Sequence, residues 1–521
     1  MFICRITLED LRKYGVKFIK GRQYKLPVSE DDFHGIANTL FDAYVEQLCL
    51  MKVKDKTMFS VGLIEISFVH NRIQALHSEL KDIGEYNCLF TDLSRVEKRD
   101  SIDKKLNESS KYYEKIYQIP KIKRYIRRFI KFFYFNSISC IFFNTIKKNK
   151  TICLGSTSKL RADFINKERL CCDYLDWVDL IDMRNNNSSK ISNEVALFEK
   201  NVVDPFLHKI ITKDAQLSEL LDRDKIKTYW KRRVSKILSY YHNVNHEKID
   251  KLLVTEAAKP IHKLIMRAYE DADKKTYLFH HGNDTALTIQ NIAHVHNIAH
   301  GENIVVPTLG IANQYNKVYG NSPLNSIMRP KYYNVYSNKK LYTRRVNQKN
   351  HISTTTRPVV MLMGYPYNDR RYTDERGMYF ITHAILEYKI LDYLKTINVS
   401  PLYKVHPDRS LEASDILREY SDTFIHGKFE DIYHMADVII FTYVSTTTFG
   451  YALTTDKKIV LIEDIDNEKD KDQWSILRKR VNTISATLNQ YGEYEFDLGD
   501  IKNNIFSKTH EIDHTYSNQY L

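Results

Sequence analysis

Short apolar runs alternate with amphipathic runs in the segment from residue 400 to residue 463. The apolar runs have the length of buried strands and are bounded by polar turns. They are Leu402 to Val405, Thr423 to His426, Val438 to Phe441 and Ile459 to Ile462. The runs between them predict helices at Leu411 to Tyr420 and Glu430 to Met435, and a third helix before the last strand. Strands that alternate with helices in this way predict a doubly wound parallel sheet.

The same alternation is present upstream, from residue 151 to residue 396. Short apolar runs there predict strands at Thr151 to Leu154, Thr276 to Phe279, Ile304 to Val306 and Pro358 to Met363. Helical periodicity predicts helices from Lys159, at Gln216 to Tyr241, at Glu247 to Ala272, from Ala286 and at Met378 to Thr396. Polar tracts without periodicity predict a loop at residues 184–190 and an interdomain connection at residues 321–357.

A length of 521 residues exceeds what one hydrophobic core usually supports, so more than one domain is expected. The two α/β halves predict two Rossmann-like domains that face a central cleft, with extra helices in the N-terminal half. Residues 1–150 are predicted to be a mixed α/β region, with helical patterns at Phe33 to Leu48, Ile73 to Ile83 and Tyr112 to Phe133. Residues 151–340 would complete the N-terminal domain, and residues 341–521 would form the C-terminal domain.

Positive charge exceeds negative charge, with 78 Lys and Arg against 65 Asp and Glu, a net charge of +13. Such a chain attracts nucleic acid, anionic lipid or a negatively charged substrate. Its densest basic cluster, at residues 121–131, is interleaved with aromatic and aliphatic residues at helical spacing. This pattern is typical of a helix on a membrane surface, and equally of a buried helix with one solvated side. The uncharged stretch at residues 132–146 is shorter than the ~20 residues of a membrane-spanning helix.

The seven cysteines are odd in number and contain no C-x-x-C pair, which argues against a disulfide framework and a zinc ribbon. The first twenty residues carry charges and have no apolar core of the signal-peptide type. We therefore expect a reducing, cytoplasmic location, with peripheral contact at the inner face of the cell membrane.

Histidines follow the predicted strand that ends at Phe279, in the sequence His280, His281, Gly282, Asn283, Asp284. Glycine after His281 permits a close backbone approach. Because the unperturbed pKa of histidine is near neutral, His281 can act as general base toward an acceptor hydroxyl, and a hydrogen-bonded turn histidine would give the same pattern. His294, His296 and His300 do not predict a metal site, because only two of them would share a helix face and no carboxylate motif accompanies them.

Two polar motifs follow strands in the C-terminal half. In the first, Lys404 to Pro407, the proline disfavours α geometry at His406 and holds the imidazole at the carboxyl edge of the sheet. There it can stabilise charge on a leaving phosphate, although an exposed strand-end histidine without function fits the pattern too. The second is the hydroxyl run Ser445, Thr446, Thr447 and Thr448 at the start of a helix. It suits a phosphate, and it also suits ordinary N-capping.

The stretch from Lys404 to Pro407, together with residues 431–453, resembles the C-terminal domain of bacterial surface-polysaccharide glycosyltransferases of GT-B fold. The resemblance is to capsule enzymes of the polysialyltransferase and Kdo-transferase type, which have a His-Pro motif and a Ser-Ser/Thr motif. The chain is also similar to teichoic-acid polymerases that use CDP-glycerol, in which a His-Gly motif is assigned the base. It departs at Gly450 and Tyr451, where many GT-B enzymes have a ribose-binding glutamate, and at residues 442–444, where the teichoic-acid type has an aspartate.

The resemblance implies a GT-B-like α/β fold and an enzyme that transfers a sugar from a nucleotide-activated donor, CMP-linked or other, to a capsule or lipopolysaccharide glycan. His281 would be the base, oriented by Asp284 or His280, with Gly282 and Asn283 on the acceptor side. The donor phosphate would be held by His406, Pro407, Ser445, Thr446 and Thr447, aided by Lys404 and by the backbone amides of Gly364 and Tyr365.

This scheme needs no cofactor or metal. The expected partners are the nucleotide-activated sugar, a glycan or glycolipid acceptor and an anionic membrane surface. Nucleic acid is not expected, because no nucleic-acid motif is present. Two alternatives stay open: a CDP-glycerol-type polyol-phosphate transferase, and a non-catalytic basic protein that binds glycan or nucleic acid.

Overall fold

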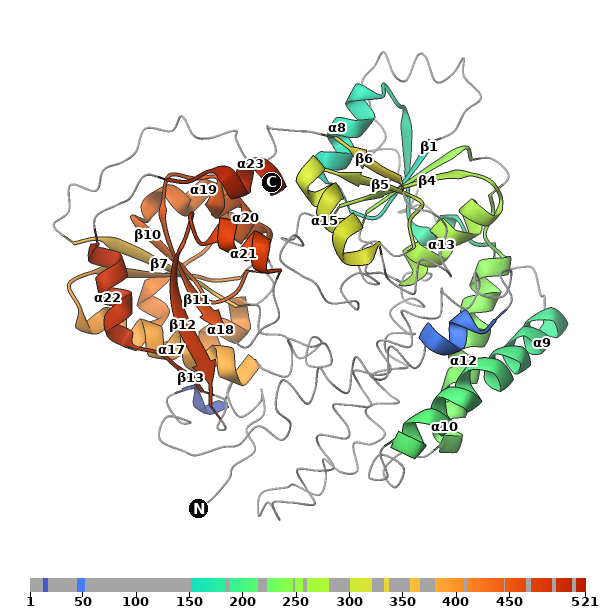
Figure 1. The fold of residues 1–521 in the computed structure, drawn as a ribbon, viewed down its shortest axis with the longest axis horizontal. Helices are drawn as coiled ribbons and strands as arrows, with labels where there is room; N and C mark the ends of the chain where they lie inside the picture. Colours follow the sequence, from blue (N-terminus) through green and yellow to red (C-terminus); the bar gives the residue numbers. More distant parts are fainter. Residues whose placement is uncertain are drawn as a thin grey trace.

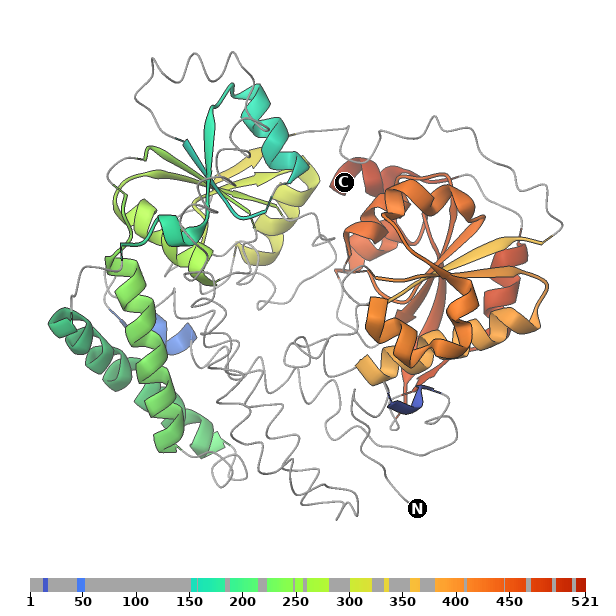
Figure 2. The same cartoon turned by 180° about the vertical axis from the view of Figure 1, so that it is seen from behind.

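The computed structural model describes two β-sheets and the helices around them (Figures 1 and 2). The described residues are 13–16, 45–51, 151–156, 158–182, 188–213, 223–246, 249–255, 260–280, 300–320, 332–336, 357–365, 380–406, 410–444, 446–464, 470–489, 493–507 and 512–521. The helices expected at Ile73 to Ile83, at Tyr112 to Phe133 and from Ala286 lie outside these ranges. Within the ranges, none of the helices combines the length and the apolar character that a bilayer crossing needs.

The first sheet has six parallel strands in the order β2-β1-β3-β4-β5-β6. Its strands are β1 (Thr151–Leu154), β2 (Cys172–Leu175), β3 (Lys251–Val254), β4 (Lys275–Phe279), β5 (Asn303–Val306) and β6 (Tyr332–Val335). The order reverses at β1, because β2 lies on one side of it and the later strands lie on the other. In doubly wound sheets such a reversal opens a crevice at the carboxyl edge, between β1 and β3 in this sheet.

Helices cover both faces of the first sheet and also form a separate arm. The covering helices include α8 (Lys159–Lys167), α13 (Pro260–Asp271) and α15 (Leu309–Tyr319). The arm consists of α9 (Ser188–Phe198), α10 (Asp204–Lys213) and α12 (Arg223–His242), and it extends away from the sheet (Figure 1). The Phe206 ring of α10 packs on the buried Trp230 ring of α12, with 5.4 Å between centroids. These helices agree with the extra helices expected in the N-terminal half.

Three predictions for this half were wrong. The helix expected at Glu247 to Ala272 is interrupted, because β3 occupies residues 251–254 and α13 starts at Pro260. Leu252 and Val254 belong to one core cluster and Leu253 to another, so both faces of β3 are buried and the strand shows no alternation. β6 lies in the predicted interdomain connection, where an edge strand that is only partly buried lacks an apolar run. The loop expected at residues 184–190 gives way to α9 from Ser188 onward.

The second sheet has seven strands in the order β13-β12-β11-β10-β7-β8-β9. They are β7 (Val359–Met363), β8 (Ser400–Lys404), β9 (Phe424–Ile425), β10 (Val438–Phe441), β11 (Lys458–Asp464), β12 (Asn482–Leu488) and β13 (Tyr494–Glu495). All pairs are parallel except β12 with β13. Counted from β7, the parallel strands follow the order 3-2-1-4-5-6 of nucleotide-binding doubly wound sheets. The predicted α/β class with parallel sheets is confirmed.

Side chains of β7 alternate between two cores, and this places the helices of the second half. Val360 and Leu362 face the core under α17 (Phe380–Thr396), α18 (Ser410–Ile416) and α22 (Leu498–Phe506). Met361 and Met363 face the opposite core. That core is covered by α19 (Phe429–Ile432), α20 (Thr447–Leu453), α21 (Lys471–Leu477), α23 (Thr515–Tyr520) and α15 from the first half. The strand order reverses at β7, so the crevice of this sheet lies between β7 and β10.

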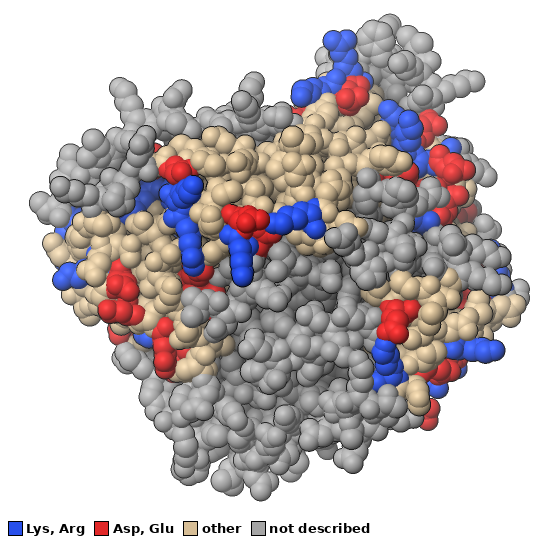
Figure 3. Space-filling view, viewed as in Figure 1, with Lys and Arg blue, Asp and Glu red and all other residues tan. Residues whose placement is uncertain are grey.

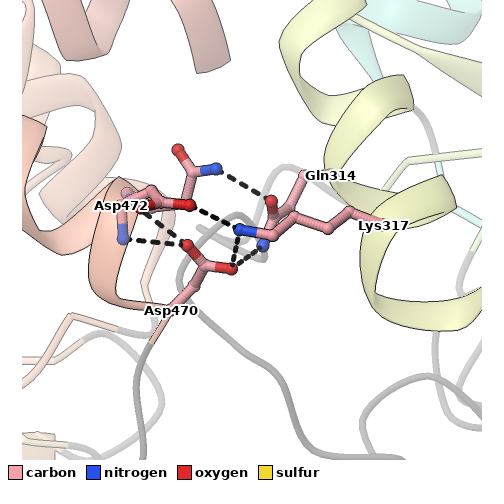
Figure 4. A network of polar contacts seen from close by, with 5 residues as sticks. Gln314, Lys317, Asp470 and Asp472 are labelled. Atoms are coloured by element: carbon pink, nitrogen blue, oxygen red, sulfur yellow. Dashed lines mark hydrogen bonds and ion pairs between the residues drawn. The ribbon is translucent and has the colours of Figure 1, made fainter.

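The two halves meet through α15, which packs against α21 and the C-terminal helix α23 (Figure 1). A polar network joins them: Lys317 Nζ lies 2.9 Å from Asp470 Oδ2 and 2.8 Å from Asp472 Oδ2 (Figure 4). Gln314 Nε2 donates to Asp470 Oδ2 at 3.2 Å and its Oε1 accepts from Gln473 Nε2 at 2.8 Å. The domain boundaries at residues 150 and 340 and the central cleft stay predictions.

Replacing Lys317 with methionine is expected to weaken this contact by about 0.5 kcal/mol at neutral pH, the size of a half-exposed ion pair. Burial raises the pKa of Asp470, but hydrogen bonds from Lys317, the Gln473 backbone N–H and Gln314 outweigh it and hold the pKa below its ordinary value. A carboxylate with a lowered pKa stabilises the fold above pH ~4, and this contribution is lost as the pH falls through the native pKa.

The measurement is the thermal unfolding midpoint at several pH values between about 3 and about 7. In Lys317→Met the acid loss should be smaller, because a higher native pKa of Asp470 leaves less stabilisation to lose, and the midpoints of the two proteins should converge as the pH falls. Lys395→Met is the control, since it removes an ion pair with Asp422 that lies within the second half. A difference between the two midpoints that stays the same from pH ~7 to pH ~3 would contradict the prediction.

Charged side chains of both signs are interspersed over the described part of the face in Figure 3. Nucleic-acid-binding surfaces typically carry a patch or stripe of Lys and Arg. On the described part of this face, Lys and Arg form no such extended stripe. The described part of this face therefore gives no support to the nucleic-acid alternative.

Candidate functional site

The polar motifs of the C-terminal half lie at one edge of the second sheet. Gly364 and Tyr365 follow β7, His406 follows β8 after one residue, and Thr442 follows β10 directly. Because β8 and β10 are both neighbours of β7 and all three run parallel, their carboxyl ends lie within about 10 Å of one another. The predicted residues Lys404, His406 and Thr446 are thus brought to the edge where the strand order reverses, and Ser445 and Pro407 lie outside the described residues.

Gly364 ties the turn after β7 to both neighbouring strands. Its N–H donates to the Lys404 carbonyl at 3.0 Å, and its carbonyl accepts from the Tyr443 hydroxyl at 3.1 Å. A Cβ at this position would lie 2.6 Å from Tyr403 Oη and 2.9 Å from the Lys404 carbonyl oxygen. The close approach therefore requires glycine, and the three strand ends are held as one rigid unit.

A buried carboxylate, Glu387 of α17, accepts hydrogen bonds from this turn and from β8. It is fully buried and accepts from the Tyr365 N–H at 2.5 Å and from the Tyr403 hydroxyl at 2.8 Å. The Tyr365 ring stacks on His383 of α17, with 3.9 Å between centroids and 7° between planes. The backbone amides of Gly364 and Tyr365 both donate inside the protein. In this conformation neither amide is free to bind the phosphate as the sequence had suggested.

Lys404 is almost fully buried at the end of β8, and its ammonium donates to the Val405 carbonyl at 2.7 Å. Burial lowers its pKa, and the carboxylate of Glu430 opposes this shift. An ammonium beneath the surface contributes positive potential at the edge of the sheet without direct contact to solvent.

One member of the hydroxyl run, Thr446, caps a helix, which is one of the two roles expected from the sequence. Thr446 is the N-cap of α20, with extended backbone, and its side chain accepts from the Thr448 N–H at 3.3 Å. A hydroxyl that accepts one bond still has a proton to donate. Thr446 is half-buried and Thr447 is exposed at the helix start, so both can meet a ligand at this edge.

On the first sheet, the structure places only His280 of the predicted acceptor-side residues. His280 follows β4, its backbone N–H donates to the Val305 carbonyl at 2.9 Å, and its Nδ1 lies 2.9 Å from the Tyr315 hydroxyl of α15. His281, Gly282, Asn283 and Asp284 lie outside the described residues. The predicted base and its orienting groups therefore stay a prediction.

The reversal point of the first sheet is filled by the protein itself. Arg161 of α8 is almost fully buried there and donates to the Leu154 and Ser156 carbonyls, each at 2.8 Å. Thr255, which follows β3, donates to the Ser156 carbonyl at 2.6 Å. Gly155 has φ +90°, and a Cβ there would lie 2.6 Å from Thr255 Oγ1. Since these groups occupy the β1/β3 crevice, the β7/β10 edge of the second sheet is the better candidate for a nucleotide.

Two residues of the site lie outside the polar motifs that were read from the sequence. Glu387 is a carboxylate in an otherwise apolar part of a helix, and Thr442 is a threonine at a strand end with a buried hydroxyl. A carboxylate on an apolar helix face was the readable sign for Glu387. Within the described part of the chain, no three His, Cys, Asp or Glu side chains are grouped so that they could hold a metal ion.

Comparisons with known proteins identify no family for this chain. No family model matches the chain, and no curated protein matches it. Among solved structures, the chain is similar to one described as an S. aureus MnaA–UDP co-structure, with a TM-score of 0.36 and 11% sequence identity. The match covers 69% of this chain and 88% of that chain. A likeness of this strength supports no conclusion about this chain.

Proposed function

We propose that this chain is a nucleotide-sugar-dependent glycosyltransferase of GT-B type that builds a bacterial capsule or lipopolysaccharide glycan. One observation carries the proposal. His406 and the hydroxyl run follow the two strands that flank β7, at the edge where a sheet of 3-2-1-4-5-6 order reverses. Nucleotides bind at this edge in doubly wound sheets, and imidazole and hydroxyl groups are suitable partners for a phosphate.

In the proposed reaction, the acceptor hydroxyl oxygen bonds to the anomeric carbon of the donor sugar while the bond from that carbon to the phosphate oxygen breaks. His281, oriented by Asp284 or His280, takes the acceptor proton. His406 and the Thr446 and Thr447 hydroxyls donate to the phosphate of the leaving nucleotide, where negative charge increases. The proton thus ends on the imidazole and the electron pair on the nucleotide phosphate.

The arrangement around the motif supports these roles in two ways. The ends of β7, β8 and β10 are bonded together through Gly364, so the groups that follow them are held before the donor binds. The buried ammonium of Lys404 favours an anion at the same edge. An anionic acceptor glycan or an anionic membrane surface would account for the net charge of +13.

The test is to incubate the full-length chain with CMP-, CDP-, UDP- and GDP-activated sugars and with CDP-glycerol, with and without glycan acceptors. We expect nucleotide release from one sugar donor that depends on the acceptor, with the sugar found on the acceptor by mass spectrometry. Turnover of CDP-glycerol alone would replace the proposal with polyol-phosphate transfer. Absence of release from every donor by folded protein would refute transferase activity.

A further inference from the structure

Thr442 has a buried hydroxyl with no partner at the edge of the proposed site. The residue follows β10 directly and is 7% exposed. Its Oγ1 makes no hydrogen bond in the structure. Burying a hydroxyl without a partner costs free energy, so folded proteins seldom do it without a functional reason.

Other buried threonines of the second half show how the fold usually satisfies this group. The hydroxyls of Thr423, Thr454 and Thr455 each donate to the backbone carbonyl three residues earlier, at 2.6, 2.7 and 2.7 Å. Among the described threonines, the buried hydroxyls without a partner are those of Thr442 and Thr382. Thr382 lies in the first turn of α17, the helix that follows β7. One of the two thus follows β10 and the other lies in the helix after β7, and these are the strands that border the crevice of the sheet.

The residues on either side of Thr442 are held in place by the fold. Phe441 before it is fully buried, and the hydroxyl of Tyr443 after it donates to the carbonyl of Gly364, the residue that follows β7. A ligand oxygen that enters this edge would give the hydroxyl its first partner. Because no bond to water has to be broken, such a contact contributes more to binding than one made by an exposed hydroxyl.

We propose that Thr442 is a further binding residue of the donor site, and that its hydroxyl donates to a phosphate oxygen of the bound nucleotide. The inference rests on the proposed function, because it takes the ligand at this edge to be a nucleotide. The buried Lys404 ammonium lies at the end of β8, two strands away, and favours the same anionic partner.

The test measures nucleotide affinity and stability in the same variants of the full-length chain. CMP, CDP, UDP and GDP are titrated into the wild type by calorimetry, and the nucleotide that binds tightest is used throughout. Thr442→Val keeps the shape of the side chain and removes the hydroxyl. We expect it to raise Kd about tenfold, as loss of one hydrogen bond to a charged group does, with an unfolding midpoint that is unchanged or higher. Thr442→Ser keeps the hydroxyl and should bind within about threefold of the wild type.

Thr423→Val is the matched control, because the Thr423 hydroxyl is buried and bonded before β9 and away from the carboxyl edge. It should lower the unfolding midpoint and leave Kd unchanged, the opposite of Thr442→Val. Unchanged affinity in Thr442→Val, or a loss of folding in that variant, would overturn the role of Thr442 and leave the proposed function standing. Failure of all four nucleotides to bind the wild type would overturn both.

Discussion

His406→Ala is expected to lower the rate of acceptor-dependent nucleotide release by about 100-fold or more, with an unfolding midpoint close to that of the wild type. Removing one group that stabilises a leaving phosphate or oxyanion commonly costs about 2.7–4 kcal/mol of barrier. His406 is half-buried at the end of β8, and the backbone beside it is held by the bond from the Val405 N–H to the Ile425 carbonyl at 3.1 Å. The strand end should therefore survive the substitution while the imidazole is lost.

The control for His406 is another histidine of the same half. His434 is exposed on the short helix that precedes β10, at the opposite edge of the sheet. His434→Ala should leave both turnover and stability unchanged. His406→Gln retains a hydrogen-bond donor near the same place and should recover part of the lost rate. If His406→Ala kept the wild-type rate, the imidazole would have no part in donor binding. The assignment of His406 to the donor phosphate would then be wrong.

The strands that the sequence predicted best are those with short apolar runs between clear turn signals. β1 and β10 have the predicted bounds, Thr151–Leu154 and Val438–Phe441. Leu402 to Val405 was one or two residues out of place, because β8 starts at Ser400 and ends at Lys404. β9 covers only Phe424–Ile425 of the strand predicted at Thr423 to His426, since a 3-10 helix extends to Thr423. Element type was thus readable from local pattern, whereas the ends were decided by neighbouring strands.

The position of the candidate site was predictable for a topological reason, and its internal bonding was not. Polar residues after parallel strands must meet at the carboxyl edge, so His406 and Thr446 were placed together from sequence alone. The Tyr443–Gly364 bond joins residues 79 apart, and which of β8 and β10 neighbours β7 is set by tertiary pairing. The same limit applies to the amides of Gly364 and Tyr365, whose partners lie on another strand and another helix.

Glu387→Ala is expected to destabilise the C-terminal half by about 3–5 kcal/mol, the second large effect that the structure predicts. The substitution leaves the Tyr365 N–H and the Tyr403 hydroxyl buried without an acceptor, at about 1–3 kcal/mol each, and it adds a cavity. It also frees the turn at Gly364 that holds the ends of β7, β8 and β10. Urea unfolding followed by circular dichroism would measure the loss, with donor turnover recorded on the folded fraction.

Glu387→Gln separates the hydrogen bonds from the charge. The amide oxygen can accept from the Tyr365 N–H while the amide nitrogen donates to Tyr403 Oη, because a tyrosine hydroxyl both donates and accepts. We therefore expect Glu387→Gln to cost about 1 kcal/mol or less. Combining it with Tyr403→Phe in a double-mutant cycle would isolate the pair, and a coupling near zero would contradict the bond. If Glu387→Ala were as stable as Glu387→Gln, the carboxylate would not be what holds the turn beneath the proposed site.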